Sequence, residues 1–112
     1  MLADPRVEVV ERSGDTVVAR VAVAADDPVF AGHFPGLPVL PGLSVVALVD
    51  RVAAVPGTRL AGIESARFAR PVFPGAELTV RLTRDAGRCA AVVSDAEGVV
   101  ARVRLRYEDV AS

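Results

Sequence analysis

The segment that most restricts the fold is residues 43–55, which read LSVVALVDRVAAV and are apolar on nearly every side. Pro-Gly pairs stand before it at 41–42 and after it at 56–57, as at helix boundaries. The length suits a helix of roughly three and a half turns. A helix this apolar must be covered on most sides, so we expect a sheet to wrap it. The β-branched valines are mediocre helix formers and leave a buried strand as the alternative. The length of the segment and the Pro-Gly pairs at both ends favour the helix.

Two-residue alternation predicts the sheet around that helix. Apolar and polar side chains alternate along residues 77–84 and 99–107, which is typical of strands with one solvated face. Weaker strand patterns cover residues 7–12, 16–24, 60–68 and 89–94. Short polar connections at 13–15, 85–87 and 95–98 suit hairpins. We therefore predict a single α+β domain over residues 1–112, an antiparallel sheet around one long helix.

Composition argues against several classes of function. The chain carries 13 basic and 14 acidic residues, a balance with no electrostatic footprint for nucleic acid. Its longest apolar run, residues 45–49, is too short to cross a membrane. With one histidine and one cysteine, no metal-ligand spacing is present. The first residues lack the basic and apolar regions of a signal peptide, so we expect a cytoplasmic protein.

The one histidine, His33, lies in a loop of unusual composition. Residues 26–42 contain four prolines, which stiffen the backbone, and three glycines, which let it approach a ligand closely. Histidine exchanges protons near neutral pH, so His33 is a candidate general base. The alternative is a histidine packed for shape and bonded to backbone.

Two stretches resemble one known family. Residues 27–42, DPVFAGHFPGLPVLPG, resemble the GHFPGxPxxPG segment of the FabZ and FabA type (3R)-hydroxyacyl-acyl-carrier-protein dehydratases. Residues 66–75, ARFARPVFPG, are similar to the family's ARFRRPVxPGD strand, with Ala69 in place of an arginine. The resemblance implies a hotdog fold whose protomers pair edge to edge. It also implies a tunnel at the dimer interface for an acyl chain carried on the phosphopantetheine of acyl carrier protein, with no other cofactor.

The resemblance also implies site residues. His33 matches the histidine that removes the α-proton of the 3-hydroxyacyl thioester, and a backbone N–H at Gly42 would polarise the thioester carbonyl. Substrate contacts are expected from Phe34, Gly36, Pro41, Gly42 and Phe68. Arg67 and Arg70 would bind the acidic carrier protein or the pantetheine phosphate. Exposed arginine is common in this chain, as at Arg102, Arg104 and Arg106, so solvated surface is the alternative.

The departure from the family pattern is at Ala47, where the family has a Glu or Asp fourteen positions after the histidine. Asp50 lies on the same helical stripe, roughly 4.5 Å further along the axis, and is a candidate substitute for the acid. The alternative is an Asp beside Arg51 on a part of the helix that reaches solvent. In the family, histidine and acid come from opposite protomers. A related hotdog subunit could therefore supply the carboxylate. Paired dehydratase subunits of this kind are associated with bacterial polyene and type II polyketide pathways, whereas a housekeeping fatty-acid enzyme is expected to keep its acid.

Three expectations follow. The chain is a dehydratase, or one subunit of it, that makes trans-2-enoyl thioesters from (3R)-3-hydroxyacyl thioesters. Alternatively it is a catalytically silent hotdog subunit that binds acyl carrier protein or a partner dehydratase. In either case it forms a homodimer or a heterodimer, because a lone hotdog protomer would leave a strand edge and apolar helix surface exposed.

Overall fold

The computed structural model describes residues 5–30 and 40–110. Its elements in chain order are strands β1 (Arg6–Ser13) and β2 (Thr16–Ala22), a 3-10 helix η1 (Pro28–Phe30), helix α1 (Gly42–Ala53), and strands β3 (Thr58–Phe68), β4 (Glu77–Asp85), β5 (Arg88–Asp95) and β6 (Gly98–Asp109). All six predicted strands and the predicted helix are present.

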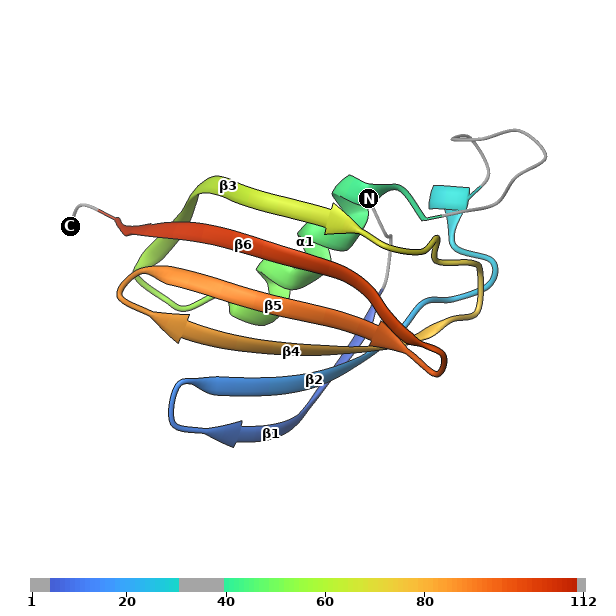
Figure 1. Ribbon diagram of the computed structural model, residues 1–112, viewed down its shortest axis with the longest axis horizontal. Coiled ribbons are helices and arrows are strands. Elements are labelled where there is room, and N and C mark those ends of the chain that lie inside the picture. The colour runs from blue at the N-terminus through green and yellow to red at the C-terminus, as the bar shows by residue number, and fades with distance from the viewer. Residues whose placement is uncertain (1–4, 31–39, 111–112) are drawn as a thin grey trace.

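The strands form one antiparallel sheet in the order β1-β2-β4-β5-β6-β3, and α1 lies against one face of it (Figure 1). The alternation explains the arrangement: Ala101, Val103 and Leu105 of β6 are fully buried on the helix side, while Arg102 and Arg104 are exposed on the other. We call these two sides the inner and the outer face. The prediction of a hotdog fold is confirmed.

The core lies between α1 and the inner face. Seven helical residues are buried there, namely Ser44, Val45, Val46, Leu48, Val49, Val52 and Ala53. The helix is not covered all round, because Leu43 keeps 74% of its surface exposed and Ala47, one turn further along, is only half-buried. The prediction of a helix wrapped on most sides therefore holds toward the sheet, and one stripe through Leu43 and Ala47 stays open.

The element boundaries differ slightly from the predicted ones. The helix begins at Gly42 and ends at Ala53, two residues before the predicted end, since Ala54 is extended with ψ 130° and Pro56 disfavours helical backbone just before it. Strand β2 ends at Ala22, after which Val23 bonds to the loop before β4, through Ala76 O at 2.9 Å. The predicted hairpin turns are present, and Ala86 and Gly87 in the β4–β5 turn both have positive φ.

One short element was not predicted. The turn of 3-10 helix η1 follows Asp27, whose side chain accepts a hydrogen bond from the Val29 N–H at 2.9 Å. Among residues 5–30 and 40–110, no helix is long and apolar enough to cross a membrane.

Candidate functional site

Two residues predicted to contact substrate meet at the start of α1. A Cβ added to Gly42 would lie 3.0 Å from Cζ of Phe68, so the aromatic ring rests directly on the glycine backbone. Phe68 is the last residue of β3 and points to the inner face, because it pairs with the buried Ala101 of β6. The residue still keeps 49% of its surface exposed. Given this close approach, any larger residue at 42 would have to displace the Phe68 ring.

The first turn of α1 leaves backbone donors available. The carbonyl of Pro41 accepts hydrogen bonds from the N–H groups of Ser44 at 2.9 Å and Val45 at 3.3 Å, and no side chain caps the helix. Within the described part of the chain, the N–H groups of Gly42 and Leu43 have no acceptor. The positive end of the helix dipole adds to these donors, so the turn suits an oxygen that gains negative charge.

A pocket of about 280 Å³ opens beside this turn. Apolar side chains line most of it, and its members include Leu40, Gly42, Val45, Phe68, Val72 and Val100. Two backbone bonds fix its walls: Leu40 N donates to Val72 O, and Ala69 N donates to Val100 O, both at 2.7 Å. The pocket thus joins the helix start to the second family-like stretch, residues 66–75.

The two arginines of that stretch lie in different surroundings. Arg70 donates to the carboxylates of Asp95 and Glu97 and to the Gly98 carbonyl, which ties the stretch to the β5–β6 turn. The hydrogen bond to Asp95 raises the pKa of Arg70, and the same bond lowers the pKa of Asp95. Arg67 instead is exposed on the outer face, opposite Arg102. Their proposed contact with a carrier protein remains a prediction, and the charge of Arg70 is already balanced within the chain.

Asp50 is held against the sheet. Its Oδ1 accepts a hydrogen bond of 2.7 Å from the hydroxyl of Tyr107, which stands on the inner face at the end of β6. Burial, and then the bond to the Asp50 carboxylate, raise the pKa of Tyr107. Ala47, where the family has its acid, lies on the open stripe of the helix, one turn before Asp50.

The remaining predicted site residues, His33, Phe34 and Gly36, lie outside the described residues. Their roles remain predictions from the sequence.

Sequence reasoning missed the partners at the far end of α1. The alternation along residues 77–84 and 99–107 includes Arg84 and Tyr107 but indicates no role for either side chain. Nη2 of Arg84 donates to Ala53 O at 2.8 Å, where the helix ends. Two-residue spacing from Leu78, Val80 and Leu82 places Arg84 on the inner face, so the alternation held the information needed to find it.

Curated relatives share the sequence pattern. A 3-hydroxyacyl-(acyl-carrier-protein) dehydratase FabZ from Polynucleobacter asymbioticus is 31% identical, with 90% of this chain and 76% of that protein covered. The enzyme of the same name from Pelotomaculum thermopropionicum is 39% identical over 62% of this chain. The match spans only 56% of that second relative, little more than half of its length.

The fold has solved counterparts. The dehydratase heterocomplex ApeI:P from Xenorhabdus doucetiae superposes with a TM-score of 0.81 at 19% identity, covering 93% of this chain and 97% of the solved one. The sequence pattern of the ApeI-like family, described as ApeI dehydratase, matches residues 9–102. The chain therefore belongs to the ApeI-like family of FabZ and FabA type hotdog dehydratases.

Proposed function

We propose that this chain is one subunit of a dehydratase that converts (3R)-3-hydroxyacyl thioesters on acyl carrier protein to trans-2-enoyl thioesters. The observation that carries the proposal is the pocket at the start of α1, where Gly42 meets Phe68 beside backbone N–H groups that have no acceptor among the described residues. Family membership supports the reaction, and the pocket is where we propose that it takes place.

The reaction assigns a task to each group. His33 removes the proton from C2, and the electron pair of that bond forms the C2–C3 double bond. The hydroxyl on C3 leaves as water after it takes a proton from a carboxylic acid. The N–H groups at Gly42 and Leu43, with the helix dipole, stabilise the charge that develops on the thioester oxygen.

The carboxylic acid is the group that this chain lacks at Ala47. We propose that a related hotdog subunit supplies it across a shared interface. Asp50 is the alternative within the chain, but its bond to Tyr107 holds it against β6. Support for a partner comes from the solved neighbour, which is described as a dehydratase heterocomplex.

The surface expected to meet the partner is uncovered and apolar. Strand β3 is an edge strand of the sheet, and its inner-face residues Leu60, Ile63 and Phe68 keep 37%, 48% and 49% of their surface exposed. Leu43 extends the same apolar surface onto the helix. A long unpaired edge beside exposed apolar side chains favours pairing with another chain.

The silent-subunit function remains the second candidate, because Ala47 removes the acid from this chain's own helix. Adding the acid back separates the two. The Ala47→Glu protein, incubated alone with 3-hydroxybutyryl and 3-hydroxyoctanoyl acyl carrier protein, should form enoyl product at least about a hundredfold faster than the unchanged protein, which is the effect typical of a general acid. Mass spectrometry detects the loss of water, and sedimentation monitors assembly.

Three controls give the result its meaning. Glutamine has nearly the same shape as glutamate but no ionisable group, so Ala47→Gln should not raise the rate of product formation. His33→Ala, added to Ala47→Glu, should abolish the increase in rate. If the unchanged protein is already active and Asp50→Asn lowers its rate about a hundredfold, Asp50 is the acid. If folded Ala47→Glu gives no product, the silent-subunit function replaces the proposal.

A further inference from the structure

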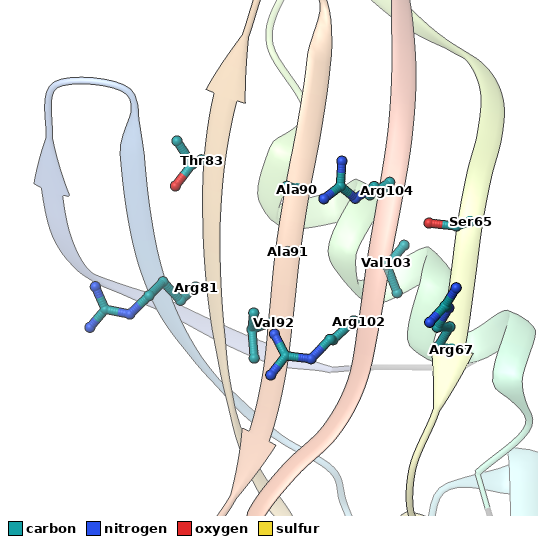
Figure 2. A pocket seen from close by; sticks show the side chains of 10 residues that line it. All are labelled: Ser65, Arg67, Arg81, Thr83, Ala90, Ala91, Val92, Arg102, Val103 and Arg104. Atoms are coloured by element: carbon teal, nitrogen blue, oxygen red, sulfur yellow. The ribbon is translucent and has the colours of Figure 1, made fainter.

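A second groove lies on the outer face of the sheet, on the side away from α1. It has a volume of about 560 Å³, and four arginines line it: Arg67 of β3, Arg81 of β4, and Arg102 and Arg104 of β6 (Figure 2). Ala90 and Val92 of β5 form part of its lining, between the arginine-bearing strands. No acidic side chain is among the described residues that line it.

The four arginines have no counterions within residues 5–30 and 40–110. Other arginines of the sheet do find carboxylates: Arg59 pairs with Glu108 at 2.7 Å, and Arg88 pairs with Glu64 at 3.2 Å. The chain has 14 acidic residues and 13 arginines, so carboxylates are numerous enough to pair with every arginine. The four groove arginines therefore do not lack ion pairs because acidic residues are scarce. The groove is distinguished by four arginines lining one surface, with no carboxylate among its described lining residues.

The sheet register makes this charge unfavourable for the protomer alone. Arg67 and Arg102 are direct partners on neighbouring strands, and Arg104 follows two residues later on the same face. Like charges directly opposite each other destabilise a sheet. A negatively charged ligand would relieve this repulsion, whereas water only screens it.

The spread of the charges indicates the kind of ligand. In Figure 2, Arg102 reaches from β6 over β5 and Arg104 points from β6 toward β5, whereas Arg81 extends toward β2 and Arg67 stays on β3. From β3 to β4 is three strand spacings in the sheet order, or about 14 Å. One phosphate needs its donors gathered around one point. Guanidinium groups spread over this width instead fit several separate carboxylates, each able to form a two-bond pair with one arginine.

We propose that the outer-face groove is a docking surface for an acidic segment of a partner protein, with carboxylates on the four arginines and its smaller apolar side chains on Ala90 and Val92. This surface lies across the sheet from the Gly42–Phe68 pocket, so it is distinct from the candidate active site. The proposal does not depend on dehydration.

The test measures binding of a fluorescein-labelled decaglutamate peptide by anisotropy at low salt. We expect saturable binding that weakens as salt is added. Charge reversal with Arg102→Glu and Arg104→Glu should weaken binding by about tenfold or more, and the milder pair Arg102→Gln and Arg104→Gln should weaken it in the same direction. The Gln pair keeps the test valid if the Glu pair does not fold.

The matched control reverses the same amount of charge elsewhere, with Arg6→Glu and Arg12→Glu on β1. Compared with the groove pair at about 0.1 M salt, where the Debye length is roughly 10 Å, these variants should change the affinity less than about twofold, because β1 lies four strand spacings from β6 and more distant exposed charges are largely screened. Equal weakening by the control pair would mean that only net charge matters and would overturn the proposal. So would displacement of the peptide by inorganic tripolyphosphate at lower concentrations than by unlabelled decaglutamate, because the groove would then be a phosphate site.

Discussion

The two ends of helix α1 are built in opposite ways. At its start no side chain caps the helix, the Phe68 ring rests on Gly42, and Leu43 is largely exposed. At its end Asp50 accepts a hydrogen bond from Tyr107, and Arg84 binds the last carbonyl, that of Ala53. Among residues 5–30 and 40–110, polar side chains thus anchor the helix to the sheet at its end and not at its start.

This asymmetry has a physical consequence for the site. Hydrogen bonds to a charged group contribute about 1.5–3 kcal/mol each, and a cation near a helix C-terminus also interacts favourably with the helix dipole. Anchored in this way, α1 needs no capping side chain at its start, where a cap would occupy the donors and the pocket. The open end can therefore receive a substrate oxygen while the other end fixes the direction of the axis.

Filling the open end is expected to have the largest effect. Even an alanine Cβ at position 42 would touch the Phe68 ring at 3.0 Å, so Gly42→Val must displace this ring and change the shape of the pocket that both residues line. In the active form of the protein, kcat/KM should fall by about a hundredfold or more, since a small misplacement near the reacting atoms has effects of this size. The thermal midpoint should change little, because the half-exposed ring can rotate away.

A second glycine of the chain provides the control. At Gly62 of β3 an added Cβ would meet only the flexible end of Arg106, at 3.2 Å, so Gly62→Val should leave kcat/KM within about threefold. Adding Phe68→Ala to Gly42→Val should restore part of the lost activity, because it returns the space. Full activity of Gly42→Val would show that the pocket at the helix start is not where the substrate binds.

Removing the anchor should reduce stability rather than chemistry. Tyr107→Phe deletes the donor to the half-buried Asp50 and should lower the free energy of unfolding by about 2 kcal/mol, as for a hydrogen bond to a charged group. Guanidinium unfolding at a fixed protein concentration measures this. Asp50→Asn keeps an acceptor and should cost less than Tyr107→Phe. A change below about 0.5 kcal/mol would mean that the bond does not anchor the helix.

The sequence carried most of the fold because its patterns are local. Alternation along residues 77–84 and 99–107 sets the inner and outer faces, and the Pro-Gly pairs mark both ends of the apolar segment. The open helix stripe could not be predicted in the same way. An apolar Leu43 looks like a core residue, and only the packing of α1 on the sheet shows that it is 74% exposed.

The site was predicted less completely, because its contacts join distant parts of the chain. The resemblance indicated Gly42 and Phe68 separately, and their contact appears only when the end of β3 meets the start of α1. Asp50 and Tyr107 are 57 positions apart, so no local spacing pairs them. The carboxylates that hold Arg70 lie at the end of β5 and in the β5–β6 turn, 25 and 27 positions away in the sequence.

The smallest expected effect is a pH dependence at the anchored end. Because the pKa of Tyr107 is raised in the folded protein, the unfolded chain loses this proton first, from about pH 10 upward. The unfolded state then binds fewer protons than the folded one, so stability falls as pH rises, by up to about 1.4 kcal/mol per pH unit. Tyr107→Phe lacks this contribution, while the buried Cys89 thiol, whose pKa is also raised by burial, is common to both proteins. The stability difference between the two should therefore shrink by about 1 kcal/mol between pH 9 and pH 11 in guanidinium unfolding. Parallel stability curves over this range would show that Tyr107 ionises as freely in the folded protein as in the unfolded chain, and the anchor would then rest on the bond from Arg84 to Ala53 rather than on Tyr107.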